Sequence, residues 1–131
     1  MKREPDRSRI IGTMLNVKRV YSPPDPKDGS RFLVDRLWPR GVKKESLKLA
    51  AWLRDVAPSD ALRKGFCHDP AKWPDFRRRY ARELDAKPET WAPILKAARK
   101  GNVTLLFAAK DEEHNNAVVL AEYLKDKVGK K

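Results

Sequence analysis

The sequence predicts an α/β fold: a layered single domain in which a small sheet of three to four strands carries helices packed on it. Hydrophobic residues make up 40% of the 131 residues, which is enough apolar material for one core. Strand-like segments, rich in β-branched and aromatic residues, alternate with segments of helical periodicity. This alternation is typical of layered α/β domains. We place the domain at residues 14–128 and expect residues 1–13 to form a flexible N-terminal arm.

The strand predictions rest on composition and on where each run stops. Residues 14–21 and 31–38 combine β-branched and aromatic side chains, and each run ends at proline. Residues 102–109 are apolar nearly throughout, as expected of a central strand buried on both faces. Residues 49–56 either extend a short helix over 43–48 or form a further strand, and we favour the strand.

The clearest helix follows Asp69 and Pro70, which suit the N-cap and the first helical position. Its apolar stripe, spaced by three and four residues, consists of Trp73, Phe76, Tyr80 and Leu84. We expect a shorter helix to open at Ser59. Two more are predicted over 90–100, capped by Thr90, and over 112–127.

The net charge of +12 indicates which classes of binding partner the surface of the protein favours. A basic surface suits polyanions such as nucleic acid, and it also suits small phosphorylated or carboxylated ligands. The run Arg77-Arg78-Arg79 and the basic ends of the chain support a nucleic-acid-binding module.

We expect a cytoplasmic protein that makes no membrane contact. No run approaches the ~20 apolar residues that cross a bilayer, and the charged N-terminus lacks the apolar core of a secretory signal. The single cysteine, Cys67, excludes an internal disulfide and every multi-thiolate metal site.

The first group of chemically versatile residues lies in Asp35-Arg36-Leu37-Trp38-Pro39-Arg40-Gly41, where the second predicted strand ends. Arg36 and Arg40 carry guanidinium groups, whose planar fork donates two parallel hydrogen bonds to phosphate or carboxylate. The alternative is structural, with Arg36 paired to an internal carboxylate and Trp38 filling the core.

The second group follows the predicted strand over residues 102–109, in the turn before the last helix. Asp111 is a natural N-cap there, which by itself explains its presence. Lys110, His114 and Asn115 add polar donors near a helix N-terminus, where anions are favoured. In a parallel sheet both groups would share the carboxyl edge, where ligands dock.

The segment Cys67-His68-Asp69 invites a catalytic or metal-binding interpretation, which we do not favour. Adjacent residues seldom aim at each other productively, so we interpret Cys67 as a buried structural cysteine. No ligand spacing typical of a metal site is found, and we predict no metal. The glycine-rich phosphate-binding and nucleotide-binding motifs are also missing from the sequence.

Several motifs in one order make the chain similar to the YeaO-like family of small bacterial proteins, a branch of a larger domain-of-unknown-function family. They are Val34-Asp35-Arg36-Leu37-Trp38-Pro39-Arg40-Gly41, Ala57-Pro58-Ser59, His68-Asp69-Pro70, Thr104-Leu105-Leu106, Ala108-Ala109-Lys110-Asp111 and His114-Asn115. The family name carries no established activity.

The resemblance implies that the first two strands are parallel, and therefore that the sheet is mostly parallel. The short connection over 22–30 would by itself suggest a hairpin, because parallel crossovers normally need a dozen or more residues. A sister branch tends to carry Cys-His-Arg in the last strand-to-helix turn, where this chain has Asn115, Asn116 and Ala117. Thiol chemistry of that branch therefore does not transfer to this chain.

Together these observations predict a site for a small phosphorylated or carboxylated anion at the carboxyl edge of the sheet. The predicted ligand-binding residues are Arg36, Arg40, Lys110, Asp111 and Asn115. His114 is the candidate catalytic acid–base group, since histidine titrates near neutrality. A nucleic-acid-binding or regulatory module is the alternative, and a protein-interaction domain without chemistry is a third. The sequence indicates no particular cofactor and leaves open whether the protein is an enzyme.

Overall fold

The computed structural model describes residues 15–67 and 69–128, so the predicted N-terminal arm lies outside the described residues. A four-stranded sheet with strand order β1-β4-β2-β3 forms the centre of the fold. The strands are β1 (Leu15–Arg19), β2 (Ser30–Leu33), β3 (Ala51–Trp52) and β4 (Val103–Phe107). All three strand pairings are parallel, which confirms the predicted fold class and strand direction.

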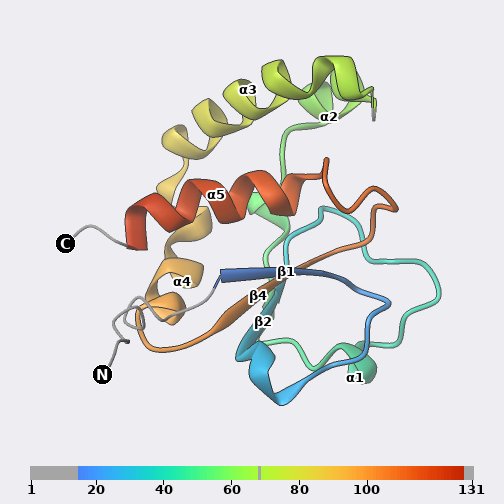
Figure 1. Ribbon diagram of the computed structural model, residues 1–131, viewed down its shortest axis with the longest axis vertical. Coiled ribbons are helices and arrows are strands. Elements are labelled where there is room, and N and C mark those ends of the chain that lie inside the picture. The colour runs from blue at the N-terminus through green and yellow to red at the C-terminus, as the bar shows by residue number, and fades with distance from the viewer. Residues whose placement is uncertain (1–14, 68, 129–131) are drawn as a thin grey trace, which may run out of the picture.

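In the described residues, five α-helices and three short 3-10 helices lie between or after the strands (Figure 1). The α-helices are α1 (Lys44–Leu47), α2 (Asp60–Phe66), α3 (Trp73–Ala86), α4 (Pro88–Ala98) and α5 (Asn116–Val128). The 3-10 helices are η2 (Pro26–Asp28), η3 (Arg54–Val56) and η4 (Pro70–Lys72). No described helix combines the length and hydrophobicity that a bilayer crossing requires.

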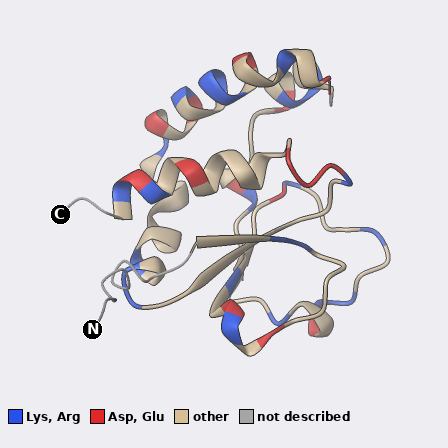
Figure 2. Cartoon of the chain, viewed as in Figure 1, with Lys and Arg blue, Asp and Glu red and all other residues tan. Residues whose placement is uncertain are grey.

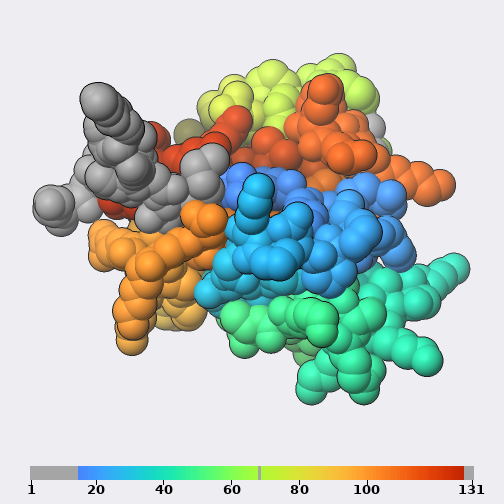
Figure 3. All heavy atoms as spheres, turned by 60° about the horizontal axis from the view of Figure 1, so that its bottom comes forward, coloured from blue at the N-terminus to red at the C-terminus, as the bar shows by residue number. Residues whose placement is uncertain are grey.

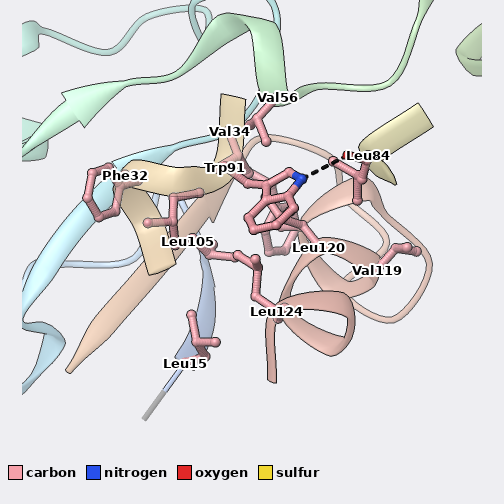
Figure 4. Close-up of a cluster of buried hydrophobic side chains, with 14 of the residues drawn as sticks. Leu15, Phe32, Val34, Val56, Leu84, Trp91, Leu105, Val119, Leu120 and Leu124 are labelled. Carbon is pink, nitrogen blue, oxygen red and sulfur yellow. Dashed lines mark hydrogen bonds between the residues drawn. The ribbon is translucent and has the colours of Figure 1, made fainter. Parts of the chain in front are cut away.

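Two cores lie on opposite faces of the sheet because neighbouring strand residues point in opposite directions. On one face Phe32, Val34 and Leu105 pack against α4 and α5, with α3 behind these helices. Figure 4 shows this cluster, in which the Trp91 indole donates to the Leu84 carbonyl oxygen at 2.9 Å. On the other face Leu33 and Leu106 form a smaller core.

The segment between β2 and β3 covers that second face. Its Leu47 is buried beside Leu33, and the Trp38 and Trp52 rings meet edge to face at 5.2 Å. Figure 3 shows this segment, coloured from cyan to green, packed against the blue part of the chain that holds β1. Helices therefore cover one face of the sheet, and a mostly irregular segment covers the other.

Several predicted elements are confirmed. The Ser59 hydroxyl caps α2 by accepting from the Leu62 amide, and Asp69 accepts from the Ala71 amide where η4 leads into α3. The ambiguous residues 49–56 contribute β3, as favoured. All five residues of β4 are buried, as expected of a central strand.

The second strand ends earlier than predicted, at Leu33 instead of residue 38. Its ladder stops because the side chain of Asp35 accepts the Ala108 amide at 2.9 Å, in place of a backbone carbonyl. The Asp35 carbonyl instead receives the Trp52 indole N–H at 2.8 Å. The chain therefore bends away from the sheet, and the residues after Asp35 are free to line its edge.

The boundaries of two helices were also predicted wrongly. Helix α4 starts at Pro88, so Thr90 lies inside its first turn and its hydroxyl donates to the Lys87 carbonyl. Helix α5 starts at Asn116 because Asp111 closes a separate turn by accepting from the amides of Glu113 and His114. The side chain of Asn115, not Asp111, caps α5 by accepting from the Val118 amide at 3.0 Å.

Charged residues lie mainly on the outer helices and connections. Figure 2 shows acidic and basic residues interspersed along α3, whereas the strands are mostly uncharged. Arg78 and Arg79 both pair with Asp75, and Arg77 pairs with Glu122. Each arginine of the basic run is thus already paired with a carboxylate.

Candidate functional site

A cavity of about 430 Å³ opens at the carboxyl edge of the sheet. Its volume falls within the range of about 300–1,000 Å³ that small-molecule sites occupy. The lining residues are Tyr21, Asp35, Arg36, Leu37, Trp38, Pro39, Arg40, Ala57, Pro58, Arg63, Phe66, Phe76, Ala108, Ala109, Asn115 and Asn116. Three arginines against one aspartate give this lining a formal charge of +2 (3 − 1).

The parallel sheet explains why residues so distant in sequence meet here. The connections that follow β1, β2 and β4 emerge on the same side, next to the start of α5 (Figure 1). They bring Tyr21, the segment 35–40 and Ala108 to one edge, while α2 and α3 close the cavity with Phe66 and Phe76. Ligands of parallel α/β sheets bind at this edge.

Arg36 has a side chain that the protein itself leaves incompletely bonded. Its Nε is buried and has no hydrogen-bond partner among the described atoms. Its carboxylate neighbour is Asp60, whose Oδ1 lies 4.0 Å away, beyond hydrogen-bonding range, on a side chain that is 63% exposed. Arg36 thus forms a long ion pair with a carboxylate of the protein and Trp38 packs in the second core, as the structural alternative expects, but this ion pair leaves the Arg36 Nε without a hydrogen bond.

Arg31 Nη2 is the other buried side-chain nitrogen of the described chain that has no hydrogen-bond partner. Its guanidinium already bonds the Asp28 carboxylate and donates to the Leu47 carbonyl oxygen at 2.7 Å. Arg31 does not line the cavity, because it lies at the start of β2. Arg36 therefore lines the cavity and also has a buried N–H donor without a hydrogen-bond partner.

The other two arginines of the cavity differ in the contacts that they make. Arg63 bonds Asp60 at 2.7 Å on the surface of α2. Arg40 is exposed, and its carbonyl oxygen accepts the Tyr21 hydroxyl at 3.1 Å, which fixes the backbone of the segment after β2.

Asp35 is the acidic residue of the lining. Burial raises the pKa of its carboxyl group above the ordinary value, while the Ala108 amide and the Asn116 side chain oppose that rise. The Asn116 amide group also donates to the Val34 carbonyl oxygen at 3.0 Å. Asp35 and Asn116 therefore tie the start of α5 to the end of β2.

The structure brings together only part of the predicted site. Arg36, Arg40 and Asn115 line the cavity, whereas Lys110, Asp111 and His114 do not. The predicted site missed Tyr21, Arg63, Phe66 and Asn116. The sequence could have indicated Asn116, because it directly follows the predicted site residue Asn115. Tyr21 and the α2 residues reach the cavity only through tertiary packing, which no local pattern shows.

The turn that holds the remaining predicted residues forms its own network. His114 Nδ1 lies 2.9 Å from Asp111 Oδ2, and the imidazole meets the Trp73 ring edge to face at 5.0 Å. The Glu113 amide, then the His114 side chain, holds the pKa of Asp111 below its ordinary value. Asn115 is buried, and its Nδ2 donates to the Asp111 carbonyl oxygen at 2.9 Å.

Cys67 is exposed at the end of α2, so its predicted burial is wrong. Its backbone takes a left-handed conformation with φ of 46°, which ends the helix and turns the residue outward. His68 lies outside the described residues. Within residues 15–67 and 69–128, no cluster of three or more histidine, cysteine or carboxylate side chains could hold a metal ion.

A second hollow, of about 680 Å³, adjoins Arg36 on the side of β3. Its basic residues Arg36, Arg54 and Lys87 face the acidic residues Asp55 and Glu89. The Lys87 ammonium already donates to two backbone carbonyl oxygens, at 2.8 and 3.0 Å. This hollow has less unmatched positive charge than the cavity at the carboxyl edge.

Comparisons with known proteins place the chain among small bacterial relatives. Residues 14–131 match the family described as the inactive DUF488-N3 subclade. The uncharacterised protein YeaO of Escherichia coli K12 is 41% identical over 111 residues, which cover 85% of this chain and 96% of YeaO. The uncharacterised protein Rv3073c of Mycobacterium tuberculosis H37Rv is 38% identical over 112 residues, covering 86% of this chain and 94% of the relative. No solved structure is significantly similar.

Proposed function

The chain belongs to the YeaO-like proteins within the inactive DUF488-N3 subclade, and from this premise we propose that it binds a small phosphorylated or carboxylated anion without transforming it. The binding site is the cavity at the carboxyl edge of the sheet. The observation that carries the proposal is the buried Nε of Arg36, a charged donor in the cavity wall without a hydrogen-bond partner. Such a donor costs stability until an acceptor reaches it.

The charge of the cavity supports an anion over a neutral ligand. Arg36 and Arg40 hold the negative charge in this proposal, and Lys110 contributes from the neighbouring turn. Asn115 and Asp111 act indirectly, because their side chains build the cap of α5 and the turn before it. Guanidinium donors in a partly enclosed site bind phosphate and carboxylate more strongly than neutral donors do.

Two features favour binding without turnover. At the positions where the sister branch tends to carry Cys-His-Arg, the side chains of Asn115 and Asn116 hold backbone groups in place. His114, the acid–base candidate, is engaged by Asp111 and Trp73 and does not line the cavity. The proposal therefore gives His114 a role in supporting the turn.

Isothermal titration calorimetry with inorganic phosphate at fixed ionic strength tests the proposal. We expect Arg36→Ala to weaken binding by about tenfold or more, since a hydrogen bond to a charged group contributes about 1.5–3 kcal/mol. Arg78→Ala is the matched control, because Arg78 is an exposed α3 residue paired with Asp75. Equal losses from both variants would show that the charge acts diffusely, and the proposed site would be abandoned.

Nucleic-acid binding makes a different prediction, which the same protein can test. Binding through phosphate contacts weakens steeply with salt because counterions are released. The ion pairs of Arg77, Arg78 and Arg79 with carboxylates leave this alternative with less support than the bare sequence gives it. A salt-sensitive gel shift that survives Arg36→Ala would favour it over the small-anion site.

A further inference from the structure

The two large hydrophobic side chains that are exposed in the described chain border the same cavity. Tyr21 is 50% exposed and Leu37 is 67% exposed, and both belong to the lining of the carboxyl-edge cavity. Single exposed hydrophobic residues are common on protein surfaces and need no explanation. Their coincidence at the rim of one cavity indicates apolar surface that a ligand covers.

The Tyr21 ring is held in place before any ligand arrives. Its hydroxyl donates to the Arg40 carbonyl oxygen, and the Arg19 guanidinium lies 4.9 Å from its ring centroid. Arg19 is itself fixed by donating to the carbonyl oxygens of Ala108 and Ala109 at 3.2 and 2.9 Å. A half-exposed ring held on two sides offers a flat surface for stacking at a low entropy cost.

The interior of the cavity is apolar as well. Phe66 and Phe76 stack at 4.6 Å between ring centroids, and the buried Pro39 and Pro58 add further apolar wall. The volume of about 430 Å³ equals that of roughly 14 waters of the liquid, so a bare phosphate ion would fill a small part of it. The cavity therefore suits an anion that carries a sizeable apolar group.

We propose that the ligand is an organic phosphate or carboxylate with a flat aromatic ring, its anionic group at Arg36 and its ring against Tyr21 and Leu37. This inference rests on the proposed function, because it assigns the ligand class of the same cavity. The arginines supply the attraction for the anion, and the rim and aromatic wall select the ring.

Calorimetric titration with phenyl phosphate and methyl phosphate tests the inference, since the two monoesters carry the same anionic group. We expect phenyl phosphate to bind about tenfold tighter to the unaltered protein. Leu37→Ser should reduce that preference several-fold, because it removes apolar surface that the phenyl ring covers and the methyl group does not reach. Tyr21→Ala should also reduce the preference, whereas Tyr21→Phe, which keeps the ring, should retain it.

The outcomes separate the inference from the proposed function. If both esters bind with equal affinity and Arg36→Ala weakens both, the cavity is an anion site and the aromatic ligand class is wrong. If neither ester binds in a manner sensitive to Arg36, both the inference and the proposed function fail. Circular dichroism of each variant checks that the fold is retained.

Discussion

The hydroxyl of Tyr80 donates to the carbonyl oxygen of Val56 at 2.5 Å, joining the middle of α3 to the 3-10 turn η3. Tyr80 is completely buried, and burial raises the pKa of its phenol well above the ordinary value. This bond fixes the segment Val56 to Pro58, of which Ala57 and Pro58 line the candidate cavity. The hydroxyl of Tyr80 therefore supports the cavity wall from behind.

Tyr80→Phe should lower the free energy of unfolding by about 1–3 kcal/mol, because it removes a buried donor from the Val56 carbonyl. Tyr21→Phe makes the same chemical change at an exposed bond and should alter stability by about 0.5 kcal/mol or less. Urea unfolding followed by tryptophan fluorescence measures both. A loss in Tyr80→Phe no larger than in Tyr21→Phe would contradict the structural role of this bond.

Gly29→Ala should be among the most damaging single substitutions in the chain. Gly29 has φ of 67°, and an added Cβ would lie 2.0 Å from the Asn102 carbonyl oxygen. That oxygen accepts the Ser30 amide at 3.0 Å, so the backbone cannot move away without breaking the start of the β2–β4 pairing. We expect a loss of at least about 3 kcal/mol in the free energy of unfolding.

Gly41→Ala provides the matched control for Gly29. Gly41 also has a positive φ, of 76°, but an added Cβ would meet nothing within 4 Å. Its cost should therefore be only the left-handed backbone strain, about 1–2 kcal/mol. Equal losses in the two variants, measured by urea unfolding, would show that the contact with Asn102 is unimportant.

Asn116→Ala should raise the pKa of Asp35 further above its ordinary 3.8, because it removes a donor that stabilises the carboxylate. A pKa raised in the folded state means that this state binds more protons than the unfolded one between 3.8 and the folded value. The contribution of Asp35 to the free energy of unfolding therefore falls as the pH rises through this interval. The substitution widens the interval toward higher pH.

Carbon-13 NMR titration of the Asp35 carboxyl group measures this shift directly. Asn102→Ala is the control, since it removes an asparagine at the opposite edge of the sheet, where the side chain donates to the Lys27 carbonyl oxygen. It should leave the titration of Asp35 unchanged. An unchanged or lowered pKa of Asp35 in Asn116→Ala would show that the Asn116 donor does not act on this carboxylate.

Local patterns in the sequence predicted the elements in which apolar side chains recur at a regular spacing or in an unbroken run. The spacing of Phe76, Tyr80 and Leu84 places them on the buried face of α3, and the apolar run around Leu105 gives the central strand. The apolar pattern does not predict the end of β2. That strand ends where the Asp35 side chain accepts a hydrogen bond from the amide of Ala108, directly after β4. That bond joins residues far apart in sequence, so no local pattern contains it.

The predicted site residues also divide into those that line the cavity and those that do not. Arg36 and Arg40 were predicted because guanidinium groups at a strand end suit anions whatever surrounds them. His114 was placed in the same site from its position after β4, but the turn closed by Asp111 turns its ring toward Trp73 instead. Side-chain hydrogen bonds within a turn decide such orientations, and residue types alone do not specify them.

The position of β4 between β1 and β2 has a consequence for synthesis on the ribosome. In the described chain, β1 pairs only with β4, and β2 reaches β1 only through β4. While translation proceeds from Leu15 to Asn102, the nascent polypeptide can pair only β2 with β3, over two residues of each strand. The native strand order can therefore form only after Val103–Phe107 has been synthesised, so assembly of the sheet depends on contacts distant in sequence.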